Sequence, residues 1–239
     1  MNLRHIIPGK VRDNVAWVIS RHRLRRAMAS SNPGDIVRMT SCFRGVGVYW
    51  PIFTMQKEQE IIACAEIVRN LKPRIIVEIG TAHGGTLFIW TRTNPQLELV
   101  VSIDLPGGTF GGGYPEGRAR LYREFTYGHP KTQMRLLRCD SHSDSTLSLL
   151  LQQLAGRKID FLWIDGDHTY DGVKKDFSMY SALVRKGGIV GFHDIITKGG
   201  GLENHEVWRF WGELKQQFPS REIIEDRSSN LMGIGILTV

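Results

Sequence analysis

Two short stretches of this sequence concentrate acidic residues and histidines. Residues 165–168 read Asp-Gly-Asp-His directly behind an apolar run, and residues 193–194 read His-Asp behind another. Carboxylates and imidazoles bind divalent cations, and an imidazole takes or gives a proton near neutral pH. Because a structural turn needs only one Asp or Gly, the surplus predicts a site. Asp171 is the exception, since an acid there suits the first turn of a helix.

A glycine-containing turn precedes both stretches in the chain. Residues 78–84 have the form E-x-G-x-x-x-G, which differs from the G-x-G-x-x-G of dinucleotide-binding folds. Glycines allow a sharp turn and a close approach of the backbone to a ligand. The acid that opens the turn cannot serve a pyrophosphate, but it can serve a cation or an amine. The pattern therefore argues against NAD.

Further polar residues follow two other apolar runs. Asp104 ends the run LVVSID, where an acid suits paired hydrogen bonds to ribose hydroxyls. Asp140 and Ser141 follow the run MRLLRC. His83 and His142 fall at the same kind of position, and each alone is interpreted as an ordinary polar loop residue.

Strands and helices alternate along the chain, and this order would position all of these residues. Ligands bind at the carboxyl ends of parallel strands in such folds. We expect an α/β fold with a doubly wound, mostly parallel, seven-stranded sheet and an N-terminal helical extension. Apolar runs predict strands at 74–80, 98–104, 134–139, 160–165, 187–194, 221–225 and 231–238, and helical periodicity predicts helices at 54–71, 84–93, 145–155, 170–185 and 205–218.

Residues 54–193 resemble the class I S-adenosylmethionine-dependent methyltransferases. The segments IDGDHTYDGVKKDF and LVRKGGIVGFHDI are similar to the branch that contains macrocin-type sugar O-methyltransferases and cephalosporin hydroxylase-like proteins. The resemblance implies a Rossmann-like fold and the following residue roles. Glu78, Gly80, Thr81 and Gly84 would line the methionine part of the cofactor, Asp104 would hold the ribose, Asp140 and Ser141 would meet the adenine, Asp165, His193 and Asp194 would bind a divalent metal, His168 would be the general base, and Asp167 would orient His168 or bind a substrate hydroxyl.

The expected activity is metal-assisted methylation of a hydroxyl on a small molecule or sugar, with S-adenosylmethionine and Mg²⁺ or Mn²⁺ as cofactors. Relatives usually have two acids where this chain has His193 and Asp194, and oxygen ligands suit Mg²⁺. An imidazole favours Mn²⁺, Fe²⁺ or Zn²⁺, unless His193 only bonds a neighbour while water fills the position. A nucleic-acid methyltransferase is one alternative, although such enzymes carry a proline-aromatic motif where IDGDHTY stands. A noncatalytic cofactor-binding protein is the other.

All of the excess positive charge lies near the N-terminus. Residues 1–50 contain nine Lys and Arg and two Asp, a balance of 9 − 2 = +7, whereas the rest balances at 22 − 22 = 0. We divide the chain into a basic helical arm at 1–53 and a cofactor-binding domain at 54–239. The segment WVISRHRLRRAMAS suits an anionic surface as a basic amphipathic helix, or packs on the domain or a second subunit. We expect a homo-oligomer.

Other features bear on location and on substrate access. The three cysteines form no C-x-x-C pair, and no apolar run reaches the roughly 18 residues of a membrane span, so we expect a cytoplasmic protein. The glycine-rich segment 104–125 is either a lid or a flexible loop. Trp208, Phe210 and Trp211 either shape an acceptor pocket or seat their helix. Val173, Phe177, Tyr180 and Val184 recur at helical spacing and are expected in the core.

Overall fold

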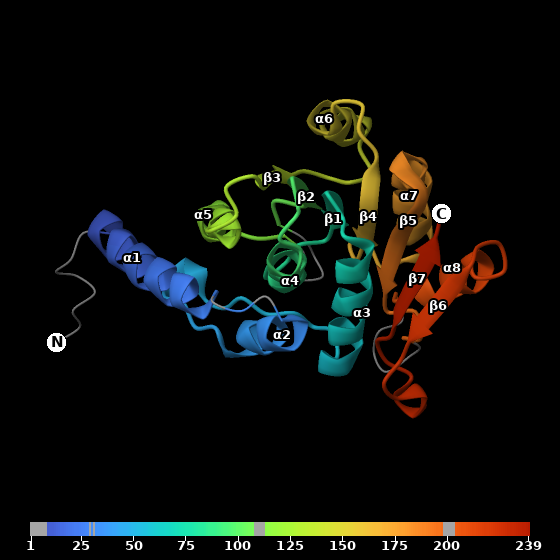
Figure 1. The fold of residues 1–239 in the computed structure, drawn as a ribbon, viewed down its shortest axis with the longest axis horizontal. Coiled ribbons are helices and arrows are strands. Elements are labelled where there is room, and N and C mark those ends of the chain that lie inside the picture. The colour runs from blue at the N-terminus through green and yellow to red at the C-terminus, as the bar shows by residue number, and fades with distance from the viewer. Residues whose placement is uncertain (1–8, 29, 31, 108–112, 198–203) are drawn as a thin grey trace.

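The computed structural model describes residues 9–28, 30, 32–107, 113–197 and 204–239. Seven strands form one sheet in the order β3-β2-β1-β4-β5-β7-β6 (Figure 1), which confirms the predicted doubly wound, mostly parallel sheet. The strands from β3 to β5 run parallel, and β7 is antiparallel to both β5 and β6. Their bounds are β1 Ile75–Ile79, β2 Leu99–Asp104, β3 Gln133–Arg138, β4 Ile159–Ile164, β5 Val184–His193, β6 Ser220–Ile223 and β7 Ile234–Thr238.

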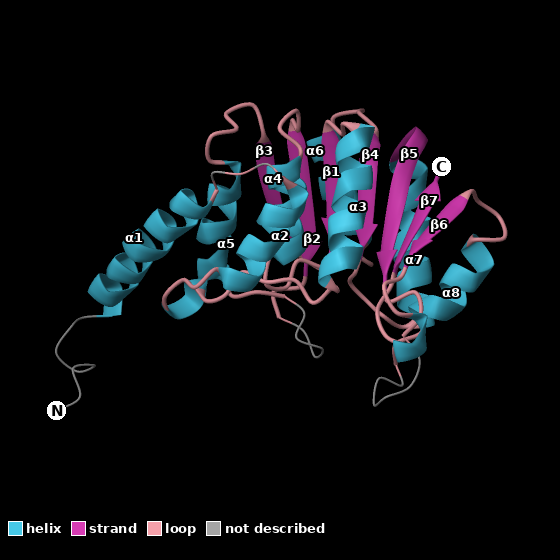
Figure 2. Ribbon diagram, turned by 60° about the horizontal axis from the view of Figure 1, so that its bottom comes forward, coloured by secondary structure: helices cyan, strands magenta, loops and turns pink. Residues whose placement is uncertain are grey.

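Helices cover both faces of the sheet, and each face has its own buried core (Figure 2). Even-numbered residues of β1, such as Ile76, point into one core, and odd-numbered residues, such as Val77, point into the other. This alternation follows from the two-residue period of a strand. The first core packs against α1 Gly9–Ala27, α2 Pro33–Cys42, α3 Glu58–Leu71, α4 Gly85–Thr93 and α5 Glu116–Arg123, and the second against α6 Asp144–Leu154, α7 Tyr170–Tyr180 and α8 Val207–Leu214.

Several predicted element boundaries differ from the structure by up to five residues, and the largest difference is at the end of α7. The helix expected at 170–185 ends at Tyr180, and after a short 3₁₀ turn β5 begins at Val184. Val184 pairs with Ile159 of β4 and is buried, so strand pairing has overridden the helical spacing. Val173 and Tyr180 are buried as expected, and Phe177 packs against the core while partly exposed.

The N-terminal arm is divided between two environments. Helix α2 lies against α3 and α4, within the layer that covers the sheet, whereas α1 extends beyond α5 (Figure 1). Trp17 anchors α1 by packing on the ring of Tyr49, with 5.4 Å between ring centroids. Arg25 adds an ion pair to Glu124 at 2.7 Å. The division into an arm and a domain at residue 53 remains a prediction.

Within the described ranges, no helix combines the length and hydropathy that crossing a bilayer requires. Cys42, Cys64 and Cys139 are free thiols, as the absence of paired spacing predicted. Residues 108–112, the centre of the glycine-rich segment expected to be a lid or a flexible loop, lie outside the described residues, whereas its second half forms α5 and packs into the core.

Candidate active site

Strand register brings the polar strand ends together. Ile79 of β1 is the partner of Ile164 of β4, and Ile164 is the partner of Phe192 of β5. The next residues along these three strands, Gly80, Asp165 and His193, therefore lie side by side. The sheet order reverses between β1 and β4, so these residues stand at the topological switch point where such sheets bind ligands.

The two glycines of the turn are required by chain packing. Gly80 has φ +89°, and a Cβ on it would lie 2.0 Å from the carbonyl oxygen of Asp165. Gly84 has φ +74°, and its Cβ would lie 2.6 Å from the Tyr122 ring. The glycines thus allow β1 to approach the end of β4 and α4 to approach α5. Their contact with a cofactor remains a prediction.

Glu78 is an unpaired acid inside the protein. Its side chain is fully buried and has no ion-pair partner among the described residues, and neither carboxylate oxygen has a well-formed hydrogen bond there, although Thr86 and Trp90 lie close enough to stabilise its charge. Burial raises the pKa of Glu78 well above its usual value, and the charges of Asp165 and Asp104 raise it further, although Thr86 lowers it. A buried carboxylate without a partner is costly, so this one suits a cationic group of a ligand.

Asp104 holds the turn together through its carboxylate. One oxygen accepts hydrogen bonds from the backbone N–H groups of Thr81 at 3.0 Å and Ala82 at 2.7 Å. The other oxygen accepts from Leu105 at 2.8 Å and Gly113 at 3.0 Å. The Thr81 hydroxyl is itself paired with Ser102. Asp104 therefore supports the backbone of the predicted cofactor site, and ribose binding there remains a prediction.

The residues after β3 are more exposed to solvent than Glu78 and Asp104. Asp140 is exposed, and its carboxylate accepts a hydrogen bond from the backbone N–H of His142 at 2.9 Å. The Ser141 carbonyl accepts a hydrogen bond from the Tyr180 hydroxyl. The His142 ring lies 3.3 Å from buried Asp176, which raises the pKa of the imidazole.

His142 therefore has a partner within the fold. The same holds for His83, whose ring meets the Arg118 guanidinium at 2.7 Å and stacks on Phe53.

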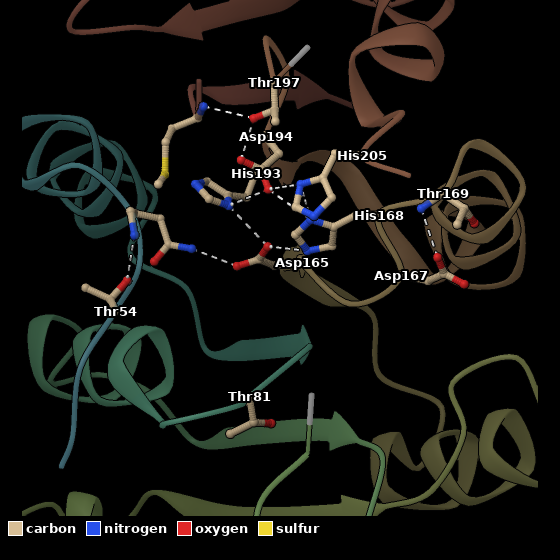
Figure 3. Close-up of polar contacts among 12 residues, drawn as sticks. Thr54, Thr81, Asp165, Asp167, His168, Thr169, His193, Asp194, Thr197 and His205 are labelled. Atoms are coloured by element: carbon tan, nitrogen blue, oxygen red, sulfur yellow. Dashed lines mark hydrogen bonds and ion pairs between the residues drawn. The ribbon is translucent and has the colours of Figure 1, made fainter. Parts of the chain in front are cut away.

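Five side chains converge where β4 and β5 end, as Figure 3 shows. Asp194, which adopts a left-handed backbone conformation at φ +59°, lies near the centre. Its Oδ2 is 2.9 Å from His168 Nδ1 and 3.4 Å from His205 Nδ1. Asp165 Oδ1 is 3.4 Å from His168 Nε2 and 3.3 Å from His193 Nδ1. Of the residues predicted for metal and base chemistry, the structure brings Asp165, His168, His193 and Asp194 together.

The carboxylates and imidazoles of this cluster shift one another's pKa. Burial lowers the pKa of His168, but hydrogen bonds with Asp165 and Asp194 outweigh it and raise the value to about 10. Despite burial, His193 and His168 hold the pKa values of both aspartates below their usual range. Asp165, Asp194, His168 and His193 therefore stabilise one another's charged forms.

Asp167 does not join the cluster, which corrects the expectation that it orients His168, while binding of a substrate hydroxyl remains a prediction. Its carboxylate points away from the histidines and accepts a hydrogen bond from the backbone N–H of Thr169 at 2.9 Å (Figure 3). It also packs over Gly172, where an added Cβ would lie 2.1 Å from the carboxyl carbon. Asp167 therefore supports the start of α7, as acids do near helix N-termini.

His205 is the member of the cluster that sequence reasoning missed. It lies just before α8, and its Nδ1 is 3.3 Å from His168 Nδ1. The available signal was a further histidine in the segment that follows His193 and Asp194.

Trp208, Phe210 and Trp211 were expected either to shape an acceptor pocket or to seat their helix. Phe210 and Trp211 are buried and seat α8, and Trp208 and Trp211 line a cavity of about 410 Å³ with Lys215 and Glu222.

Comparison with known proteins identifies the domain. Residues 77–195 match a protein-family model described as a methyltransferase domain. The protein y4gI of Sinorhizobium fredii is 28% identical over 158 residues, which are 64% of this chain and 16% of that protein. The chain spans half or less of the length of the curated relatives that it matches.

Solved structures share the fold. An O-methyltransferase from Bacillus cereus in complex with SAH has a TM-score of 0.55 and 16% identity, over 88% of this chain and 91% of that chain. The O-methyltransferase TomG from Streptomyces achromogenes, involved in tomaymycin synthesis and in complex with SAM, has a TM-score of 0.54 and 17% identity, over 74% of this chain and 78% of that chain. These similarities confirm the predicted methyltransferase fold.

Proposed function

Because residues 77–195 make this chain a member of the class I methyltransferases, we propose that it transfers a methyl group from S-adenosylmethionine to a hydroxyl of a small molecule or sugar. One observation carries the proposal. An unpartnered buried carboxylate, Glu78, and a cluster of aspartates and histidines stand on adjacent strands at the switch point of the sheet. The Glu78 carboxylate suits a cationic cofactor, and the cluster of aspartates and histidines suits activation of a hydroxyl.

The residues at the ends of β1, β2 and β3 fit S-adenosylmethionine. Glu78 has no cationic partner among the described residues, and the cofactor carries an ammonium group that would supply one. Asp104 keeps the Thr81–Ala82 backbone in place beside it. Asp140 and Ser141 follow β3, next to β2, at the side of the site assigned to adenine by resemblance. Both compared O-methyltransferases are in complex with SAM or SAH, which supports this assignment.

The carboxylate oxygens and imidazole nitrogens of the cluster at the ends of β4 and β5 fit a divalent cation. Asp165 and Asp194 are ionised, largely buried and close to three imidazoles. A divalent cation bound there would lower the pKa of an acceptor hydroxyl and orient it. Gln56 donates a hydrogen bond to Asp165 at 2.7 Å and the Thr197 hydroxyl donates one to Asp194 at 2.8 Å, so both carboxylates are held in place.

His168 is better suited to holding the site than to removing the acceptor's proton. Its Nε2 faces Asp165 and its Nδ1 faces Asp194, so neither ring nitrogen is turned toward an incoming hydroxyl. We therefore assign His168 to the cation-binding group in place of its expected role as general base.

The alternative of a nucleic-acid methyltransferase has less support, because no proline follows β4 as it does in base-modifying enzymes.

Isothermal titration calorimetry of the purified chain tests the cofactor assignment. We expect S-adenosylhomocysteine to bind and NAD to give no heat. Glu78→Gln should weaken S-adenosylmethionine binding by about 10- to 100-fold, because it removes a charge-assisted bond worth roughly 1.5 to 3 kcal/mol. Tight NAD binding without heat from either sulfur ligand would refute the proposal.

A further inference from the structure

Three donor atoms in the cluster form a nearly equilateral triangle. His168 Nδ1 and Asp194 Oδ2 are 2.9 Å apart, His205 Nδ1 and the same oxygen are 3.4 Å apart, and the two Nδ1 atoms are 3.3 Å apart. The three residues come from the loop before α7, the end of β5 and the loop before α8. The fold has therefore gathered two imidazoles and a carboxylate from three separate segments around one point.

The triangle has the size of one face of a metal coordination sphere. Nitrogen and oxygen ligands lie about 2.0 to 2.1 Å from a zinc ion, so neighbouring donors are about 3.3 to 3.4 Å apart in a tetrahedron and about 2.8 to 3.0 Å apart in an octahedron. All three observed distances fall close to these edges. The side chains of His168 and His205 are 22% and 20% exposed, so the triangle can be reached from solvent.

Neighbouring residues hold two of the three ligands, His168 and Asp194, from the side that faces away from the triangle. The outer nitrogen of His168, Nε2, lies 3.4 Å from Asp165, which in turn accepts the hydrogen bond from Gln56. The outer oxygen of Asp194 accepts a hydrogen bond from the Thr197 hydroxyl, which accepts one from the backbone N–H of Met232 at 2.9 Å. Carboxylates behind ligating histidines fix the ring orientation and strengthen metal binding.

We infer that His168, Asp194 and His205 bind a first-row transition-metal ion, of the class of Zn²⁺, Co²⁺, Fe²⁺ or Mn²⁺, in preference to Mg²⁺. Two imidazoles and one carboxylate suit these ions, whereas Mg²⁺ prefers oxygen ligands. Asp165 then acts behind His168 as an orienting group. The inference deepens the proposed function by naming the ion at its site, and it can be tested without any methyl transfer.

Cobalt provides the direct test. The full-length chain, stripped of metal with a chelator, is titrated with Co²⁺ while its visible absorption is recorded, and Zn²⁺ or Mg²⁺ is then added. We expect saturable one-to-one absorption bands that Zn²⁺ abolishes and that excess Mg²⁺ leaves unchanged. His205→Ala and His205→Gln should weaken Co²⁺ binding by more than about 100-fold, whereas Asp165→Asn should weaken it by about 10- to 100-fold, the range for a group that orients a metal-binding histidine.

His142→Ala is the matched control, because His142 is a similarly exposed imidazole paired with an aspartate outside the triangle. It should bind Co²⁺ like the wild type. Calorimetry with S-adenosylhomocysteine on the same samples reports folding and cofactor binding separately. The inference is overturned if the wild type binds no Co²⁺, if Mg²⁺ competes equally well, or if both His205 variants bind Co²⁺ normally. In each of these cases, retained S-adenosylhomocysteine binding would leave the proposed function standing.

Discussion

At the scale of single residues, Asp104 serves the fold while standing where a ribose-binding acid is expected. Its four backbone hydrogen bonds join the turn at 81–82 to the chain at Leu105 and Gly113. A carboxylate that only bound ribose would have free acceptor positions in the absence of a ligand. Removing Asp104 should therefore affect folding and binding together.

Asp104→Ala is expected to lower both the free energy of unfolding and the affinity for S-adenosylhomocysteine. Each buried N–H that loses its acceptor costs about 1 to 3 kcal/mol, so the loss of stability should exceed 1 kcal/mol. Urea unfolding and calorimetry measure the two effects. Asp140→Ala provides the contrast, because the exposed carboxylate of Asp140 accepts one backbone hydrogen bond within the described residues, from His142. An unchanged unfolding midpoint for Asp104→Ala would show that the carboxylate serves the ligand alone.

Residue types at the strand ends could be predicted from the sequence, but their directions could not. Asp165 and Asp167 are two positions apart and chemically identical, yet one faces the histidines and the other supports α7. The backbone conformation of the turn between them sets the direction of each side chain, and the spacing of residues in the sequence does not predict that conformation. His205 was missed because its contact with His168 spans 37 residues and depends on how α8 packs.

At the scale of elements, close packing between β1 and β4 positions the cluster. Gly80 lies against the Asp165 carbonyl, so any side chain on Gly80 must push the start of the Asp165 turn away. Alternating strands and helices could be predicted from apolar runs and periodicity. The end of α7 could not, because the partner of Val184 is Ile159, a residue 25 positions earlier in the chain.

Gly80→Ala should destabilise the protein far more than Gly128→Ala. The two glycines have similar φ values, +89° and +82°, but nothing lies within 4 Å of a Cβ on Gly128. Gly128→Ala should cost about 1 to 2 kcal/mol, the penalty of a left-handed alanine. Gly80→Ala should cost that amount plus the displacement of Asp165, and should also weaken Co²⁺ binding. Equal unfolding free energies for the two variants, measured in urea, would rule out a special role for the β1–β4 contact.

At the scale of the whole molecule, the basic arm presents an apolar surface that nothing described in the structure covers. Trp17 and Leu24 of α1 are buried against the body, but Val11, Val15, Val18 and Ile19 are 37% to 63% exposed. The spacing of these four residues places them on one side of a helix. The sequence revealed the charge of the arm, but not that α1 would bury one face and expose a second.

An apolar helix face within a segment of net charge +7 matches an anionic lipid surface, which combines hydrocarbon with negative headgroups. Deleting the arm would expose the core around Trp17, so point substitutions are the cleaner test. Val15→Asp combined with Val18→Asp should weaken binding to vesicles of anionic lipid by about 10- to 100-fold, because a buried valine contributes roughly 1.5 kcal/mol or more. Wild-type binding should also fall as salt is added.

The control for that experiment carries the same change in charge at another exposed site. Leu149 and Leu151 of α6 are 41% and 46% exposed on the opposite face of the sheet, so Leu149→Asp with Leu151→Asp should leave vesicle binding within a few-fold of the wild type. Co-sedimentation with vesicles measures binding, and sedimentation velocity without lipid measures particle size. A wild-type oligomer that only the Val15 and Val18 substitutions dissociate would contradict lipid binding, because a second copy of the chain would then cover the helix face.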